Sequence, residues 1–488
     1  MSFERNFIKE PENPMGNKVY FMGVGGIAMG NLAMMFHEMG YDVVGSDSAL
    51  YPPMSNYLAK AAIRVHMPYS ETNISSEKMN MVVVGNVIRA TNPEAIWLMD
   101  NGGKIPYVSM AEAVKKFVIR DRKSLVVAGT HGKSTTAALL GWLLEKLGED
   151  PTVFIGAIMR TWDRGYRLGN GDFAVLEGDE YDTAFFDKIP KFLHYSPFGT
   201  IITGIEFDHA DIYRNIDEIR SAFEKFVALI PPNGIMVVFD KEPHRYRLAE
   251  ICRGIVVTYG FGNDADWKLL EYSPRGGKSK CVIQKKGCGD FKIILNTMGK
   301  HNALNTLGVI ALLDALGILQ KCGFSRLQEA LSSFPGLKRR QEVLFTNGQY
   351  VVIDDFAHHP TAVRETISAV RYHFPHQRII AIFEPRTNTS KRKIFQEDYV
   401  RALSGADNVL LKTPPGYTDL PSQDRIDLNK LAADLDARGI PSHCFFDTDD
   451  LFQQIVKSKG EKVLLFMSNG AMDKLPWRVA DYFKSLKD

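Results

Sequence analysis

Short apolar runs alternate along the chain with longer stretches in which apolar residues recur every third or fourth position. The runs are rich in Val, Ile and Leu, and most of them end at Gly, Asp or Ser, which is typical of strands buried in a parallel sheet. They occupy residues 18–23, 41–45, 81–84, 105–108, 124–128, 173–177, 200–203, 350–353, 378–383, 408–411 and 462–467. The helical spacing occupies residues 29–39, 139–147, 301–316, 361–373, 427–438 and 449–457. This alternation of strands and helices predicts an α/β fold.

A glycine turn follows the strand at 124–128 and reads Gly129-Thr130-His131-Gly132-Lys133-Ser134-Thr135. A Gly-Lys-Ser turn between a strand and a helix is typical of a phosphate-binding loop, because backbone N–H groups and the positive helix end face the anion. Lys133 is expected to reach the terminal phosphates, and Ser134 or Thr135 to offer a hydroxyl to Mg²⁺. The general pattern begins with Gly where this chain has Val127, and an ordinary strand–helix turn is the alternative interpretation.

The N-terminal strand leads into a second glycine turn, Gly23-Val24-Gly25-Gly26-Ile27-Ala28, which opens a helix. The next strand ends at Ser46-Asp47, so an acidic residue lies about 20 residues after the turn. This G-x-G-x-x-A pattern is the dinucleotide-binding fingerprint and predicts a nucleotide diphosphate at the start of the helix. By itself it does not distinguish NAD from a UDP-sugar, and glycines needed only for tight packing are the alternative.

Acidic residues follow two strands in the middle of the chain. Glu177 ends one strand, and Glu206, Asp208 and His209 follow the next. Hard cations take oxygen ligands at the carboxyl edge of such a sheet, so Glu177 is expected to oppose the loop hydroxyl across Mg²⁺. His209 is expected to bind a second Mg²⁺ or to orient a carboxylate, and a histidine satisfied within the fold is the alternative.

Polar groups also mark the chain beyond residue 300. Asn302 and Asn305 are three positions apart on a predicted helix, so they share a face that can form hydrogen bonds with the edge of a planar base. Helix capping is the alternative for one of them. Further on, polar motifs follow three strands, at 354–360, 384–389 and 468–470. Because the carboxyl ends of parallel strands share one edge of a sheet, these motifs predict a second ligand-facing surface.

A chain of 488 residues is expected to form about three domains, at roughly 150 residues each. The charged stretch 115–123 is interpreted as one linker and the basic stretch 334–342 as another. We predict a Rossmann-like N-terminal domain over residues 1–120, a central P-loop ATPase-like α/β domain over 121–337 and a Rossmann-like C-terminal domain over 338–488. Residues 278–295 of the central domain alternate as a β-hairpin does.

Composition adds constraints on location and partners. The formal charge of +2 gives no basis for a nucleic-acid surface, and no protein partner is indicated. The five cysteines form no C-x-x-C pair and are expected to be reduced thiols. Residues 1–17 lack the apolar stretch of a signal peptide, and the longest apolar run, 309–319, is too short to span a membrane. A cytoplasmic protein without a membrane partner is expected.

Taken in order, the motifs resemble those of one family. The glycine turns, Glu177-Gly-Asp-Glu, Glu206-x-Asp208-His209, His301-Asn302-x-x-Asn305 and Asp355-x-x-His358 follow one another as they do in Mur ligases. The resemblance extends over essentially the whole chain. It implies an ATP-dependent ligase that forms an amide (C–N) bond in a peptidoglycan precursor, with ATP and Mg²⁺ as cofactors.

The resemblance also implies a role for each matched residue. The catalytic residues would be Lys133, Glu177 and His209, and the metal ligands Ser134, Glu177 and His209. ATP would contact residues 129–135, with Asn302 and Asn305 at adenine, Asp355 at the ribose and Arg340 at the γ-phosphate. The UDP-sugar would contact Gly23, Gly25, Gly26, Ser46 and Asp47. The incoming peptide would contact Arg386, Asn388 and His358.

Segments 51–55, 184–188 with 191–195, and 383–389 further resemble the branch of the family that acts in peptidoglycan recycling. That branch joins L-Ala-γ-D-Glu-meso-diaminopimelate to UDP-N-acetylmuramate through an acyl phosphate. A ligase that adds L-alanine to the same acceptor is the close alternative. A non-catalytic UDP-sugar-binding protein is the alternative of a different class. An NAD-dependent oxidoreductase would leave the phosphate loop unexplained.

Overall fold

The computed structural model describes residues 17–101, 104–275, 278–458 and 460–486. The first 16 residues, where the sequence predicts no signal peptide, lie outside these ranges. The chain forms two compact units: unit 1 holds residues up to 205, 217–258 and 308–330, and unit 2 holds 206–216, 259–307 and 331–488. Within the described ranges, no helix is both long and apolar enough to cross a bilayer.

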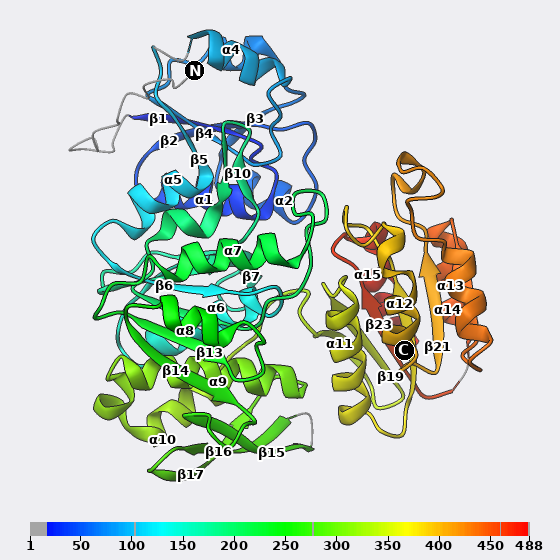
Figure 1. Ribbon diagram of the computed structural model, residues 1–488. Helices are drawn as coiled ribbons and strands as arrows, with labels where there is room; N and C mark the ends of the chain where they lie inside the picture. The colour runs from blue at the N-terminus through cyan, green and yellow to red at the C-terminus, as the bar shows by residue number, and fades with distance from the viewer. Residues whose placement is uncertain (1–16, 102–103, 276–277, 459, 487–488) are drawn as a thin grey trace. The chain divides into compact units, whose positions relative to one another are not determined.

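The N-terminal part of unit 1 is a parallel sheet with strand order β3-β2-β1-β4-β5, drawn in blue in Figure 1. This order places the glycine turn after the central strand β1 (Lys18–Met22), where doubly wound sheets bind ligands. The other strands are β2 (Asp42–Ser46), β3 (Arg64–His66), β4 (Met81–Val84) and β5 (Tyr107–Ser109). The helices are α1 (Ile27–Glu38), α2 (Met54–Lys60), α3 (Glu71–Ser75), α4 (Pro93–Asn101) and α5 (Met110–Ala113).

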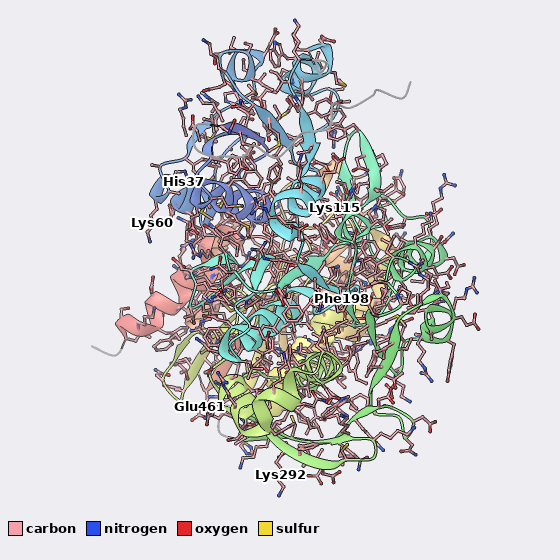
Figure 2. The ribbon with its side chains drawn as sticks, turned by 90° about the vertical axis from the view of Figure 1, so that its left-hand side faces the viewer. His37, Lys60, Lys115, Phe198, Lys292 and Glu461 are labelled. Atoms are coloured by element: carbon pink, nitrogen blue, oxygen red, sulfur yellow. The ribbon has the colours of Figure 1, made fainter. Side chains whose placement is uncertain are left out.

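The predicted linker at 115–123 is wrong. The π-helix η1 (Val114–Ile119) occupies most of it, and β6 (Lys123–Ala128) begins at its last residue. Lys115 is exposed (Figure 2), while Phe117 is buried and packs against the rings of Phe36 and Tyr41. Lys115 is a solvated charge on this helix, whereas Arg122, beyond the end of the helix, is half-buried and donates to the carbonyl of Gly169 at 3.0 Å. The charge pattern alone did not separate this packed segment from a linker.

The central sheet of unit 1 has the strand order β14-β13-β12-β6-β9-β7-β8. β6 lies between β9 (Phe173–Gly178) and β12 (Gly199–Ile202) and is parallel to both. The other strands of this sheet are β7 (Thr152–Met159), β8 (Arg164–Arg167), β13 (Ile235–Phe239) and β14 (Ile255–Gly260). β10 (Asp182–Ala184) and β11 (Asp187–Pro190) form a separate two-stranded hairpin. The helices are α6 (Lys133–Lys146), α7 (Ile216–Val227), α8 (Arg245–Ile251), α10 (Ile318–Ser332) and η2 (Lys191–Tyr195).

Unit 2 contains a six-stranded sheet in the order β18-β19-β23-β20-β21-β22, in which β18 alone is antiparallel to its neighbour. The strands are β18 (Glu342–Thr346), β19 (Tyr350–Asp355), β20 (Arg378–Phe383), β21 (Asn408–Lys412), β22 (Ser442–Phe445) and β23 (Lys462–Met467). The helices are α11 (Pro360–His373), α12 (Gln396–Leu403), α13 (Leu428–Asp436), α14 (Thr448–Lys457) and α15 (Leu475–Ser485), with short turns η3 (Lys393–Phe395), η4 (Tyr417–Asp419) and η5 (Met472–Lys474).

Alternate residues of these strands build two cores, because successive side chains of a strand point to opposite faces. Val351 and Ile353 join the core beneath α11, α12 and α13, whereas Val352 joins the core beneath α14 and α15. Unit 2 also contains the antiparallel strands β15 (Trp267–Arg275), β16 (Lys278–Lys285) and β17 (Gly289–Leu295), followed by the start of α9 (Lys300–Ala315).

The structure confirms the predicted α/β class. Each predicted strand is present, with ends within two residues of those expected. The predicted hairpin at 278–295 is β16 and β17, which β15 extends to three strands. The domain boundaries at 120/121 and 337/338 stay predictions.

Candidate functional site

The phosphate-loop turn lies between β6 and α6, as its sequence predicts. Gly132 is the N-cap of α6 with φ of +78°, and Gly129 has φ of +132°. A Cβ on Gly129 would lie 2.2 Å from Thr203 Oγ1, so only glycine fits. Thr203 Oγ1 donates to the carbonyl of His131 at 2.6 Å, and the N–H of Thr130 donates to Gly204 O at 2.9 Å. The residues after β12 therefore fix the turn and leave it at the positive end of a 14-residue helix.

Lys133 is held by a carboxylate that the sequence analysis did not assign. Its Nζ lies 2.7 Å from Glu180 Oε2, and the two side chains are 12% and 2% exposed. Burial alone would lower the pKa of Lys133, but Glu180, Asp179 and Glu177 outweigh burial and raise the pKa. The lysine is therefore a firmly charged cation at the start of α6.

Ser134 and Glu177 lie together, as predicted. Ser134 Oγ donates to Glu177 Oε1 at 2.8 Å, and the N–H of Gly156 on β7 donates to Glu177 Oε2 at 2.9 Å. A hydroxyl and a carboxylate are hard oxygen ligands, so this pair fits Mg²⁺ in its donor chemistry. Gly156 could not be predicted from the sequence, because a lone glycine inside a strand carries no chemical signal of its own.

The N-terminal glycine turn also contacts its predicted acid. The N–H of Gly25 donates to Asp47 Oδ2 at 2.7 Å, and Gly26 is the N-cap of α1. Gly23 has φ of +83°, which fits a tight turn. Ser46 differs from this group: it is buried, and its hydroxyl donates to the buried Glu94 at 2.5 Å. The structure thus brings Gly25 and Asp47 together and turns Ser46 to the interior.

In unit 2, the segment after Glu206 contacts the start of α11. Thr361 Oγ1 donates to Glu206 Oε2 at 2.7 Å, and His359 Nε2 lies 3.3 Å from the carbonyl of Phe207. His209 has φ of +55°, and its N–H donates to Asp208 Oδ1 at 2.7 Å. The segment is therefore fixed by side chains that the motif analysis did not assign, namely His359 and Thr361.

Asp208 lies among imidazoles. Burial alone would raise the pKa of this carboxyl, but its histidine neighbours outweigh burial and lower the pKa to about 2. These neighbours are His209, His358 and His359. Two predicted site residues, His209 and His358, therefore both lower the pKa of one carboxyl, which stays ionised at neutral pH.

The two predicted adenine ligands lie together on α9. Asn305 Nδ2 donates to Asn302 Oδ1 at 3.4 Å, and Asn302 Nδ2 donates to Gln341 Oε1 at 3.1 Å. The N–H of Gln341 donates to Asp355 Oδ2 at 2.7 Å, so Gln341 joins the asparagines to the predicted ribose ligand. Burial lowers the pKa of the adjacent His301 to about 4, although Asp355 opposes the shift.

The three polar motifs of the C-terminal sheet meet at one edge, as expected. Ser468 Oγ donates to Glu384 Oε2 at 2.6 Å. Arg339 donates from Nε to Asp354 Oδ2 at 3.2 Å and from Nη2 to the carbonyl oxygen of Ser468 at 2.7 Å. Arg386 lies against the backbone of Gly470, where a Cβ would be 2.4 Å from its Cδ and its Nη1.

Two further predicted residues also lie in unit 2. Asn388 Nδ2 lies 3.4 Å from Asp211 Oδ2, and the Arg340 guanidinium lies 4.4 Å from the centre of the Phe356 ring. Arg339 and Gln341, on either side of Arg340, were not singled out by sequence, although the basic run 338–340 marked their neighbourhood.

Parallel α/β sheets and a Gly-Lys-Ser turn opening a helix define the class of phosphate-loop α/β proteins. Comparison with known proteins narrows this class. Residues 18–122 match the description "Mur ligase family, catalytic domain", residues 127–313 "Mur ligase middle domain" and residues 339–470 "Mur ligase, glutamate ligase domain". The chain is 34% identical over 468 residues to UDP-N-acetylmuramate–L-alanyl-γ-D-glutamyl-meso-2,6-diaminoheptandioate ligase of Escherichia coli K12, covering 95% of this chain and 98% of that one.

Two solved structures are similar over nearly the same length. UDP-N-acetylmuramate–alanine ligase of Thermotoga maritima has a TM-score of 0.79 and 27% identity, covering 96% of this chain and 99% of the other. The murein peptide ligase of Psychrobacter arcticus has a TM-score of 0.71 and 28% identity, covering 95% and 98%. The chain belongs to the Mur ligase family and is an ATP-dependent ligase that forms a C–N bond.

Proposed function

We propose that this ligase joins L-Ala-γ-D-Glu-meso-diaminopimelate to UDP-N-acetylmuramate. The observation that carries the proposal is the group of Lys133, Ser134 and Glu177 at the start of α6, which suits ATP cleavage. The choice of substrates is supported by the 34% identity to the Escherichia coli enzyme that bears these substrates in its name. We place the reaction in the cytoplasm, in the recycling of recovered peptidoglycan peptides.

In the proposed reaction, the lactyl carboxylate of UDP-N-acetylmuramate attacks the γ-phosphorus of ATP. The products of this step are ADP and an acyl phosphate. The free amine of the tripeptide then attacks the acyl carbon, and the tetrahedral intermediate expels phosphate as the amide forms. A proton leaves the amine, so that one amide, one ADP and one phosphate result. Such a reaction depends on positioning and charge neutralisation rather than on a protein nucleophile.

The chain's own residues have distinct roles in this proposal. Lys133 neutralises the terminal phosphates, aided by the N–H groups of residues 129–135 and by the positive N-terminal end of α6. Ser134 and Glu177 would hold Mg²⁺, with His209 as a further ligand, and a bound magnesium ion would neutralise phosphate charge. Asn302 and Asn305 would hold adenine, Asp355 the ribose and Arg340 the γ-phosphate.

The remaining ligand-facing residues would select the two other substrates. Gly23, Gly25, Gly26 and Asp47 would face the UDP group, whereas the hydroxyl of Ser46 is engaged with Glu94 and would act through that contact. Arg386 would bind a carboxylate of the tripeptide, because a guanidinium forms paired hydrogen bonds with planar anions, and Asn388 and His358 would flank it.

A second candidate is the addition of L-alanine to the same acceptor. It is favoured by the structural likeness to the Thermotoga maritima alanine ligase, whose TM-score of 0.79 exceeds that of the Psychrobacter arcticus peptide ligase at 0.71. Sequence identity points the other way, since a relative at 34% is named for the tripeptide. We therefore prefer the tripeptide.

The test incubates the protein with ATP, Mg²⁺ and UDP-N-acetylmuramate, adding either the tripeptide or L-alanine. Phosphate release and the mass of the product are measured. The proposal expects both signals with the tripeptide. Product with L-alanine alone would replace it by the second candidate, and binding of the UDP-sugar without either product would indicate a non-catalytic binding protein.

Matched lysine variants complete this test. Lys133→Met is expected to lose ligation, whereas Lys225→Met, at an exposed position of α7, is expected to retain it. Equal activity of the two variants would remove Lys133 from the mechanism.

A further inference from the structure

Asn31 is a polar residue buried within unit 1. It lies on α1, the helix that the N-terminal glycine turn opens, and its side chain is 0% exposed. A buried carboxamide requires hydrogen-bond partners, because an unpaired one has lost its bonds to water without replacing them. Asn31 finds its partners on two strands of the central sheet: its Nδ2 lies 3.5 Å from Ile155 O on β7, and its Oδ1 accepts from Gly165 N on β8 at 3.2 Å.

These two contacts lie where the strand ladder is interrupted. β7 and β8 pair at Phe154 with Tyr166 and again only at Met159 with Arg164, so β7 has a bulge between the two pairs. The carboxamide of Asn31 supplies the acceptor and the donor that a continuous ladder would have supplied. Gly165 is required beside it, because a Cβ there would lie 2.1 Å from Asn31 Nδ2 and 2.2 Å from Ala157 O.

The same bulge turns Gly156 towards Glu177. Pairing between β7 and β9 ends at Phe154 with Leu176, so Gly156 lies beyond the last backbone pair. Its N–H donates to Glu177 Oε2 at 2.9 Å, while Glu177 Oε1 accepts from Ser134. Bulges near functional sites commonly redirect a group in this way. Gly156 follows directly after Ile155, the residue whose carbonyl faces Asn31.

We propose that Asn31 is a positioning residue for the ligase: its buried carboxamide holds the β7 bulge that directs the Gly156 N–H to Glu177. The glycine-turn helix α1 and the carboxylate assigned to magnesium are thereby linked through one short run of β7. The inference rests on the proposed function only in taking Glu177 as a metal ligand. The placement of Gly156 by Asn31 stands on the contacts themselves.

A matched control lies two turns along α1. Glu38 accepts from Tyr166 Oη at 2.8 Å and pairs with Arg164, so it also ties α1 to β8, but through side chains on either side of Gly165 rather than through the backbone groups of the bulge. Asn31→Leu replaces the carboxamide with an apolar side chain of the same branching, and Glu38→Gln weakens the second tie. Comparing the two variants separates a loss of anchoring from a loss of positioning at Glu177.

The first readout is Mn²⁺ binding followed by EPR, with a non-hydrolysable ATP analogue, so turnover is not required. Removing a group that orients a metal ligand typically weakens metal binding about 10–100-fold. Asn31→Leu is expected to weaken Mn²⁺ binding at least tenfold and Glu38→Gln to leave it unchanged. Mn²⁺ affinity of a folded Asn31→Leu protein within twofold of wild type would overturn the proposal.

The second readout is hydrogen exchange of the Gly156 and Gly165 amides, which does not depend on the proposed function. Protection in wild type that falls at least tenfold in Asn31→Leu supports the proposal, and unchanged exchange at Gly156 overturns it. If the Glu177→Gln variant binds Mn²⁺ with wild-type affinity, Glu177 is not a metal ligand. Hydrogen exchange at Gly156 then decides alone whether Asn31 positions this amide. If Asn31→Leu does not fold, the wild-type Gly165 amide decides: slow exchange supports the proposal, and exchange at the rate of an unstructured amide overturns it.

Discussion

Glu180→Gln and Lys133→Met each remove one charge from an ion pair whose Nζ and Oε2 atoms are 2.7 Å apart. The side chains are only 12% and 2% exposed, so water screens neither remaining charge well. Breaking a buried pair by removing one partner typically costs about 3–5 kcal/mol, against about 5–15 kcal/mol for the unfolding of a whole domain. We expect each single variant to lose about 3 kcal/mol of unfolding free energy, at the lower end of that range because neighbouring acids remain.

The double variant Lys133→Met/Glu180→Gln leaves neither buried charge unpaired. Its loss of unfolding free energy is therefore expected to be smaller than the sum of the two single losses by about 2 kcal/mol or more, a coupling that a double-mutant cycle measures. The assay is urea unfolding near pH 7, extrapolated to water. Ligation is measured in parallel, and the double variant is expected to be folded but inactive, because Lys133 is absent.

Three outcomes are informative. Additive losses would show that the two charges do not interact in solution, and single losses below about 1 kcal/mol would show that the pair behaves as an exposed one. Either result would refute the reasoning from burial. A double variant that ligates at the wild-type rate would refute the role of Lys133 instead.

The other predictions concern unit 2. His301 is uncharged when folded, since burial lowers its pKa to about 4, whereas the unfolded chain takes up the proton near pH 6.5. The contribution of His301 to the unfolding free energy is therefore complete above about pH 6.5 and falls by about 3 kcal/mol as the pH is lowered towards 4. His301→Phe should reduce this dependence of the unfolding free energy on pH. An unchanged dependence, measured by urea unfolding at several pH values, would contradict the lowered pKa of His301. Asn305→Ala should raise the KM for ATP about tenfold with little change in kcat, because one hydrogen bond to the base is lost. An unchanged KM would show that Asn305 does not contact adenine. Gly470→Ala adds a Cβ that would lie 2.4 Å from Arg386. Because the guanidinium must then move, the KM for the tripeptide should rise about tenfold while the KM for ATP stays constant. A rise in both KM values would show that the substitution disturbs the fold and not only the position of Arg386.

Much of this architecture was accessible from sequence because it is local. A buried parallel strand requires a continuous apolar run, and a phosphate-binding turn requires glycines where φ is positive, as at Gly129 and Gly132. The pair Ser134 and Glu177 was also predictable, because both lie at the carboxyl ends of strands that turned out to be adjacent, β6 and β9.

What the sequence did not predict depends on contacts between distant residues or on backbone irregularity. Nothing near Gly156 signals that its N–H bonds to Glu177, since that depends on a bulge in β7. Glu180 is one of several acids in residues 177–182, and only the packed geometry selects it as the partner of Lys133. The linker prediction for residues 115–123 was wrong for a related reason. The charges of this stretch are evident from the sequence, while the burial of its apolar residues depends on the aromatic rings that they contact.

The strand order of the C-terminal sheet has a consequence for synthesis of the protein. β23, the last strand in the sequence, lies between β19 and β20 at the middle of that sheet. During translation the inner edges of β19 and β20 consequently have no partner until residues 462–467 leave the ribosome, and open strand edges favour aggregation. A chain that stops short of residue 462 would lack the centre of the sheet rather than its rim, so premature termination even this late is expected to yield a product that chaperones and proteases handle as unfolded.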